Sequence, residues 1–202
     1  MGPLMPITIP EIRARLLAHE AVHLSNQAGR QAAVAMLLRS ARSGVEMLFI
    51  ERAHRRADPW SGQMALPGGM VEAADVDPQA AAERETAEEV GLHIGSQHRL
   101  GRLGDLRGRH AGQPIPIVIS CFVYQATDSP IPTPNEEVQD TVWVPFEVLL
   151  DRSRWVDVHH PRAPDQSFKG IRVSDAEHQI VWGLTHRFLG RFFNVVDLPF
   201  DI

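Results

Sequence analysis

The stretch LPGGMVEAADVDPQAAAERETAEEVGL, residues 66–92, joins a tight glycine turn, a polar loop and a segment with clear helix signals. Asp77 occupies a position that suits an N-cap, and Pro78 is favoured as the first residue of a helix. Gly91 suits the position that ends one. The pattern predicts a helix from Pro78 to Val90, around which the rest of the chain is organised.

The acidic residues of this predicted helix gather on one face. Glu85, Glu88 and Glu89 are spaced i, i+3 and i+4, so they repel one another by roughly a few tenths of a kcal/mol per pair. Small apolar residues lie roughly opposite and are expected to pack on a core: Ala80, Ala87 and Val90. An acidic face alone is usually a solvated helix side, but it also suits a bound cation.

Hard oxygen ligands on one helix face are typical of Mg²⁺ or Mn²⁺ sites. Arg84 precedes the cluster and can pair with a carboxylate, which would hold that side chain in a ligating rotamer. The residue types therefore indicate a divalent-cation site that would also contact phosphate oxygens of a substrate.

The spacing resembles the signature of the Nudix hydrolases: a glycine, an acid after five residues, and a later Arg-Glu, Glu-Glu and Gly. Here Gly69 is followed by five residues and Asp75, and residues 84–92 read RETAEEVGL. Asp75 replaces the usual Glu, the spacer before Arg84 has eight residues instead of seven, and Thr86 occupies an apolar position. The first two departures are similar to the coenzyme A diphosphatase branch of the family.

The resemblance implies an α/β fold, a Nudix α/β/α sandwich with a central mixed β-sheet. It also implies Mg²⁺ or Mn²⁺ as cofactor. Glu85 and Glu89 would be direct ligands, and Glu88 a ligand or a residue that helps to deprotonate water. The carbonyl of Gly69 would complete the shell because glycine allows close backbone approach. Arg84 would orient a ligating glutamate.

Further positions resemble the same branch. Arg52 would end a strand, and Gln63 belongs to a Gly-Gln pair before the glycine turn, so both are expected to bind substrate. The alternative for Arg52, Arg55 and Arg56 is a solvated loop. Glu137 precedes an apolar strand ending in Pro, where a family acid can reach the metal–water cluster; otherwise it is a surface turn acid.

Basic residues also occur in the stretch LRGRHAGQP, residues 106–114, which we interpret as a loop between strands at 98–105 and 115–125. Arg107, with Arg109 and His110, is expected to face a polyanionic substrate. A solvated loop explains these residues equally well.

Composition limits the other possibilities. The chain has 202 residues, 44% of them hydrophobic and 22% charged, with a net charge of −5 and a pI of about 6.0. This balance does not favour nucleic-acid or anionic-membrane partners. Cys121 is the single cysteine, which argues against a disulfide framework, and the sequence shows neither a signal peptide nor a transmembrane span. We expect a cytoplasmic protein with a small-molecule diphosphate substrate, and a homodimer is left open.

The chain divides into an N-terminal helical extension, residues 1–29, and a Nudix domain with a C-terminal helix, residues 30–202. Helical spacing extends from Pro10 to about residue 24. Two apolar runs, residues 31–38 and 45–52, indicate a hairpin buried on both faces. Residues 152–177 form a long irregular stretch or a hairpin over the pocket, and residues 178–193 are expected to form the last helix.

The predicted activity is hydrolysis of a diphosphate linkage in a nucleoside diphosphate derivative. Coenzyme A or acyl-coenzyme A is the substrate that the resemblance implies, with adenosine 3′,5′-bisphosphate and a phosphopantetheine as products. ADP-ribose, a nucleotide sugar or a dinucleotide is the alternative. A nucleotide-sensing module without catalysis is more remote, because such modules typically lose the acids that are kept here.

Overall fold

A mixed sheet of seven strands forms the centre of the molecule in the computed structural model, which describes residues 7–24, 29–55, 60–110, 113–126, 130–160 and 163–200. Its path runs β3 (Met64–Ala65), β2 (Gly44–Arg52), β1 (Gln31–Ala41), β6 (Gln113–Gln125) and β5 (Arg99–His110). β4 (Gly68–Met70) pairs with β1, and β7 (Val138–Pro145) pairs with β2. Only β1 and β6 are parallel among these pairs.

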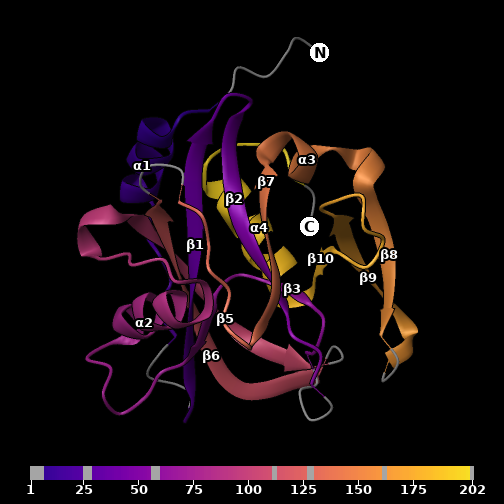
Figure 1. Cartoon of the computed structure of the whole chain (residues 1–202), viewed down its shortest axis with the longest axis horizontal. Coiled ribbons are helices and arrows are strands. Elements are labelled where there is room, and N and C mark those ends of the chain that lie inside the picture. Colours follow the sequence, from indigo (N-terminus) through magenta and orange to yellow (C-terminus); the bar gives the residue numbers. More distant parts are fainter. Residues whose placement is uncertain are drawn as a thin grey trace.

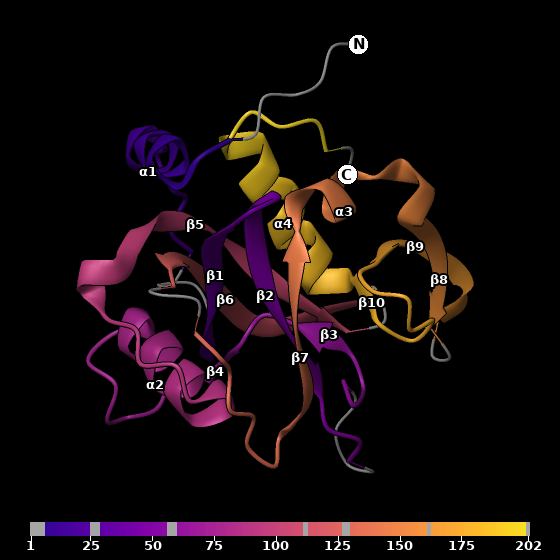
Figure 2. The same ribbon diagram turned by 45° about the horizontal axis from the view of Figure 1, so that its top comes forward.

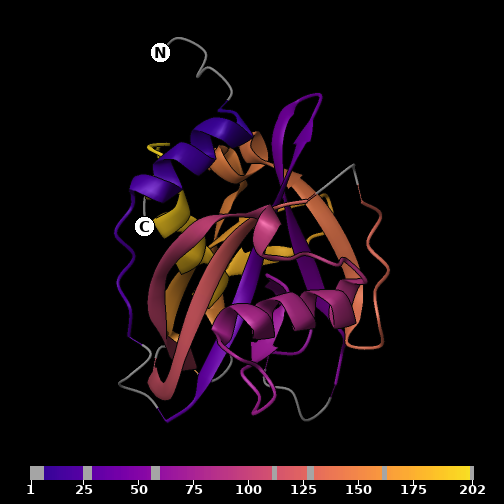
Figure 3. The same cartoon turned by 90° about the vertical axis from the view of Figure 1, so that its left-hand side faces the viewer.

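Helices cover both faces of this sheet, and Figure 3 shows α2 (Pro78–Val90) across the face opposite α1 (Ile9–Ala18) and α4 (Gly183–Val195). The layering follows from the period-two alternation of strands. In β1, Ala35 and Leu37 belong to the core beneath α2, whereas Met36 and Leu38 belong to the core beneath α1, α3 (Phe146–Leu150) and α4. The predicted α/β/α sandwich and the doubly buried hairpin are confirmed.

Helix α2 has the predicted bounds. The Asp77 carboxylate accepts a hydrogen bond from the Ala80 amide at 2.8 Å, and Gly91 ends the helix with φ of 67°. The predicted packing face was partly wrong, since Ala80 and Ala87 are only half-buried. Of the predicted face, only Val90 is buried. The helix is rotated so that it also buries Ala81, Ala82, Thr86 and Glu89. This rotation draws one acid of the cluster into the protein.

Thr8 caps helix α1, which ends at Ala18, so the prediction of a helix to about residue 24 was wrong. The following segment is extended because it pairs with β5. The Asp105 amide donates to the carbonyl of Val22 at 2.8 Å, and the buried Asp105 carboxylate accepts from the Leu24 amide at 2.7 Å. The first of these bonds gives the backbone amide of Asp105 a partner, which it would lack if the segment continued as a helix.

The predicted loop at 106–114 was also largely wrong, because β5 and β6 extend through most of it. Leu106 pairs with Ile119, and Arg107 pairs with Val118, in an antiparallel ladder. Leu106 and Gly108 are buried while Arg107 and Arg109 are exposed, which is the alternation of a one-sided strand. The glycine and arginine content of this stretch had suggested a loop, but its backbone hydrogen bonds to the partner strand make it part of the sheet.

A second, three-stranded sheet lies beside the first and is formed by β8 (Trp155–His160), β9 (Ala163–Arg172) and β10 (Ile180–Trp182), as Figures 1 and 2 show. The hairpin alternative for residues 152–177 is therefore correct. The helix predicted from residue 178 begins only at Gly183, whose φ of 62° turns the chain after β10. Val181 is held in the sheet by pairing with Ile171. No helix in the described part of the chain is long and apolar enough to cross a membrane.

Candidate active site

The glycine turn of β4 lies directly against the first residues of β1. Gly68 pairs with Val34 and has φ of 150°, a conformation that L side chains rarely adopt. A Cβ atom at this position would overlap the Ala33 carbonyl. The Gly68 amide donates to Glu89 Oε2 at 2.8 Å, so the turn fixes one acid of α2.

Gly69 gives the same kind of close approach to a second acid. A Cβ atom on Gly69 would overlap the carboxylate of Glu85. The Gly69 backbone and the Glu85 carboxylate therefore share one surface, which is the juxtaposition that the sequence predicts for a metal shell. This observation explains why glycine is needed at this position.

Arg84 joins the acidic helix to the preceding loop. Its guanidinium donates to both carboxylate oxygens of Asp75, at 3.1 and 3.0 Å, and to the Met70 carbonyl at 3.2 Å. It also contacts Glu85 Oε1 and Glu88 Oε2, each at 3.0 Å. Hydrogen bonding to Arg84 lowers the pKa of Asp75, and the pKa of Arg84 is raised in return. Arg84 therefore contacts three acids of residues 69–92, the stretch that resembles the Nudix signature and is called the box below. Its role in orienting a metal-ligating glutamate stays a prediction.

Glu89 is buried and Glu85 is half-buried, and both carboxylates carry raised pKa values. Burial raises the pKa of Glu89 to about 7, against the opposing hydrogen bond from Gly68; the nearby charge of Glu85 adds to the rise. Burial also raises the pKa of Glu85, although Arg84 opposes it. A divalent cation would remove this penalty, because it favours the charged form of each carboxylate.

Divalent cations such as Mg²⁺ prefer oxygen ligands. Neighbouring elements offer such ligands here: Glu85 and Glu89 on α2 and the backbone carbonyl of Gly69 on β4. In the described ranges, however, no group of three His, Cys, Asp or Glu side chains already has a metal-holding arrangement. Arg84 bridges Glu85 and Glu88 instead. Rotation of Glu88, which is exposed, would free it to act as a further ligand.

Glu137 lies near this cluster although it is distant in sequence. Its negative charge contributes to the raised pKa values of both Glu85 and Glu89. Its Oε1 atom accepts from Arg55 Nη1 at 2.9 Å, and its carbonyl accepts from the Ala53 amide at 2.8 Å. The structure thus brings this sequence-predicted acid to the box and pairs it with Arg55; Arg56 lies outside the described residues.

A pocket of about 570 Å³ opens beside the box glycines. Arg52 and Gln63, both predicted to bind substrate, line it together with Gly68 and Gly69. Arg107 is exposed and is not among its lining residues, whereas Arg109 is. Of the basic residues predicted to face the substrate, Arg109 therefore lines the pocket and Arg107 does not; both lie on β5 and not in the predicted loop.

Sequence reasoning named no residue of the opposite wall of the pocket, although a hairpin at 152–177 over the pocket was one of its alternatives. This wall comes from the small sheet and the start of α4, and it includes His160, Phe168, Lys169, Trp182 and Arg187. Phe168 and His160 each lie 5.7 Å from Trp182 between ring centroids. Residues 180–187 had been predicted as part of the last helix, 178–193, with no role in the pocket assigned to them.

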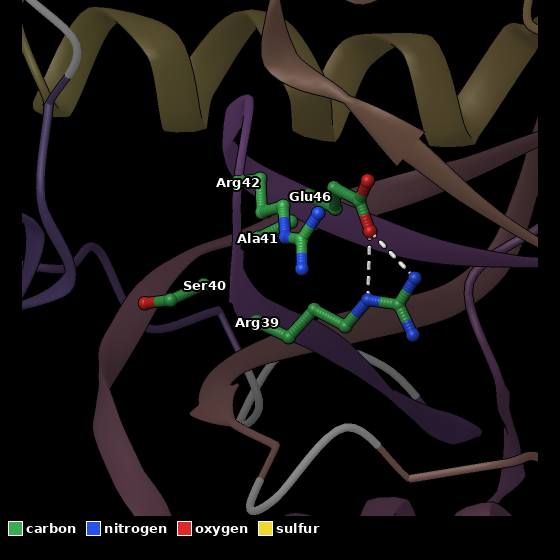
Figure 4. Close-up of a pocket in the computed structure, with 5 residues that line it drawn as sticks. All are labelled: Arg39, Ser40, Ala41, Arg42 and Glu46. Carbon is green, nitrogen blue, oxygen red and sulfur yellow. Dashed lines mark hydrogen bonds and ion pairs between the residues drawn. The ribbon is translucent and has the colours of Figure 1, made fainter.

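Another hollow lies at the tip of the β1–β2 hairpin, at the opposite end of β1 from the glycine turn (Figure 4). Arg39 in this hollow pairs with Glu46 at 2.6 Å and lies over the Trp143 ring at 4.3 Å. These contacts satisfy the arginine within the protein, so the hollow is a structural feature of the hairpin and not a second candidate site.

The fold is therefore an α/β/α sandwich in which a glycine turn fixes an acidic helix at the edge of a pocket. The family model described as the NUDIX domain matches residues 29–166, and the chain belongs to this family. The boundary predicted near residue 29 between an extension and the domain stays a prediction, since α1 also packs on the core.

Two relatives illustrate the similarity. Nudix hydrolase 22, chloroplastic, of Arabidopsis thaliana is 30% identical over 83% of this chain, which spans about half of that protein, 55% of its length. The mitochondrial coenzyme A diphosphatase NUDT8 of Homo sapiens is 27% identical over 87% of this chain and 73% of the human protein.

A solved structure agrees at the level of the fold. The MutT/nudix family protein of Enterococcus faecalis aligns with a TM-score of 0.55 at 16% identity, covering 95% of this chain and 70% of that one.

Proposed function

We propose that this protein hydrolyses the diphosphate linkage of a nucleoside diphosphate derivative with the help of Mg²⁺ or Mn²⁺. The observation that carries the proposal is a pair of acids that contact the two glycines of the turn, the buried Glu89 and the half-buried Glu85. Burial raises the pKa of both, and they lie at the edge of a pocket whose lining includes basic residues. Without a cation, the negative charges of these carboxylates are disfavoured by burial, and the basic residues of the pocket favour an anionic substrate.

The protein residues divide the work of phosphoryl transfer, which chiefly requires positioning and charge neutralisation. Glu85 and Glu89 would hold the cation, with the Gly69 backbone beside them, and Arg84 would fix their rotamers. A bound divalent cation would supply Lewis acidity and lower the pKa of a coordinated water. Glu88 or Glu137 would accept the proton of the attacking water. Water adds to one phosphorus, and the other phosphate leaves.

Coenzyme A or acyl-coenzyme A is the substrate that we propose within this class. Two observations support it: the box carries Asp75 and the eight-residue spacer before Arg84, which resemble the coenzyme A diphosphatase branch, and the human relative is named as a coenzyme A diphosphatase. The products would be adenosine 3′,5′-bisphosphate and phosphopantetheine or its acyl derivative.

The experiment is a substrate panel of coenzyme A, ADP-ribose and diadenosine polyphosphates, each assayed with Mn²⁺, with Mg²⁺ and with EDTA. Coenzyme A should be cleaved only with a metal. Glu89→Gln should lose more activity than the roughly 10- to 100-fold cost of removing an outer partner of a metal site. Glu147→Gln, which neutralises an exposed acid on α3, is the matched control.

Turnover of ADP-ribose without turnover of coenzyme A would refute the substrate but leave the reaction class standing. Absence of metal-dependent cleavage across the whole panel would refute the activity. Equilibrium binding of coenzyme A to Glu89→Gln, with turnover abolished, would distinguish loss of catalysis from loss of folding.

A further inference from the structure

The substrate pocket is basic although the protein as a whole is acidic. The chain carries a net charge of −5, yet the described residues that line the pocket include no Asp or Glu. Four lining residues carry permanent positive charge: Arg52, Arg109, Lys169 and Arg187. A concave surface with one sign of charge attracts ligands of the opposite sign.

The four cations differ in what they contact. Lys169 Nζ pairs with Asp157 at 2.8 Å, and Arg52 lies close enough to the box to lower the pKa of Glu89. Arg109 and Arg187 have no carboxylate partner among the residues that the structure describes; Arg187 Nη1 donates to the Arg107 carbonyl at 3.1 Å. These two guanidiniums therefore keep donors available for a ligand.

Arg109 and Arg187 come from separate elements that meet at the pocket. Arg109 projects from β5, where the adjoining Gly108 leaves room for the side chains of Ile115 and Ile117. Arg187 lies in the second turn of α4 and is half-buried. Burial, followed by the positive charges of Arg109 and Arg191, lowers the pKa of Arg187. A bound anion would relieve this repulsion.

The strand that carries Arg109 is separated from the glycine turn. Across the sheet, β4 is followed by β1, β6 and β5, which is three strand spacings or roughly 14 Å at ~4.8 Å each. The intervening wall is apolar and includes Ile117 and Ile119. A diphosphate bound at the box would therefore not reach Arg109 and Arg187, which remain available for a different anionic group.

We propose that Arg109 and Arg187 bind a second phosphate of the substrate, a phosphomonoester on the ribose that is distinct from the diphosphate to be cleaved. This inference rests on the proposed function and deepens it. Two guanidiniums suit a phosphate dianion because each presents several donors in a fixed geometry. The pair makes the enzyme prefer nucleotides that carry the extra phosphate over those that lack it.

The test compares coenzyme A with 3′-dephospho-coenzyme A in wild-type protein, Arg109→Gln and Arg187→Gln. In each variant, KM for coenzyme A should rise about tenfold, as expected for loss of one hydrogen-bonded charge contact. KM for the dephosphorylated substrate should change less than about threefold, and kcat should be retained for both. Arg13→Gln, on the exposed face of α1, controls for the loss of one positive charge.

A second readout does not depend on turnover. Binding of adenosine 3′,5′-bisphosphate and of AMP is measured by calorimetry on the same proteins. Wild type should bind the bisphosphate more tightly, and both variants should lose that preference. Equal losses for the two substrates, or equal affinity of wild type for the two nucleotides, would overturn the proposal. If the bisphosphate preference is present but no diphosphate is cleaved, the pair stands and the proposed activity fails.

Discussion

At the scale of single residues, two adjacent glycines have different tasks. A Cβ atom at Gly68 would meet backbone at Ala33, and the φ of 150° is unfavourable for any L side chain. The three atoms nearest to a Cβ atom at Gly69 would all belong to the carboxylate of Glu85, the end of a flexible side chain. One glycine is therefore needed by the fold and the other by the site.

The two alanine substitutions should separate these roles. Gly68→Ala should destabilise the protein by about 2–4 kcal/mol, from overpacking and backbone strain. Gly69→Ala should leave the melting temperature nearly unchanged but displace Glu85, so kcat/KM should fall by roughly 100-fold, like other disturbed metal shells. Thermal unfolding and Mn²⁺ titration measure the two effects. A Gly69→Ala protein with normal Mn²⁺ affinity would contradict this account.

Glu89 makes stability depend on pH in the metal-free protein. Its pKa is raised from 4.5 to about 7 by burial, which corresponds to on the order of 3 kcal/mol at a pH above both values. Since the folded state holds the proton more tightly than the unfolded state, this acid destabilises the fold increasingly as pH rises from about 4.5 to 7. His186 acts oppositely, because burial lowers its pKa to about 4.

Comparison with Glu89→Gln isolates this residue from His186. In EDTA, the variant should gain stability relative to wild type as the pH is raised from about 5 to 8, reaching a few kcal/mol. Urea unfolding at several pH values measures the difference. Saturating Mn²⁺ at pH 8 should stabilise wild type and not the variant. A difference that stays constant with pH would show that Glu89 is not desolvated.

At the scale of elements, the sequence predicted best where local signals and tertiary pairing agree. Helix α2 has a cap, an initial proline and a terminal glycine, and its acids are neighbours on one helix, so the box could be predicted from spacing. The ladder of β5 and the strand β10 could not, because glycine, arginine and a short apolar run are compatible with several conformations. The far pocket wall is assembled from distant segments and leaves no local pattern.

The attachment of the small sheet to the main sheet is one such tertiary feature. Gln179 Nε2 donates to Glu51 Oε2 at 2.9 Å and to Asp140 Oδ2 at 3.2 Å. Glu51 and Asp140 are register partners on β2 and β7, and Glu51 is only 3% exposed. His178 Nε2 lies 3.4 Å from the same Glu51 oxygen. One amide thus joins two acids of the main sheet to the strand that carries Trp182.

Gln179→Ala should cost about 1–3 kcal/mol, since it leaves a buried acceptor without its main donor. KM should rise as well, because β10 contributes to the pocket wall. Chemical unfolding and steady-state kinetics measure both effects, and Gln166→Ala, at an exposed position of β9, is the control. Unchanged stability in the Gln179 variant would show that water replaces the amide at Glu51.

At the scale of the whole molecule, a basic pocket in a protein of net charge −5 concentrates its attraction for anions at one place. Electrostatic attraction of this kind accelerates encounter and is screened within about 8 Å at physiological ionic strength. Buried catalytic contacts are screened much less. The charge distribution should therefore affect substrate capture more than the chemical step.

Raising the salt concentration from about 0.02 to 0.5 M should lower kcat/KM several-fold for a diphosphate substrate while kcat changes little. Arg109→Gln should show a shallower dependence, since it removes one exposed charge of the pocket, whereas Arg13→Gln should retain the wild-type slope. Kinetics in NaCl and in a second monovalent salt exclude a specific ion effect. Equal slopes for all three proteins would mean that the charge at Arg109 plays no part in capture.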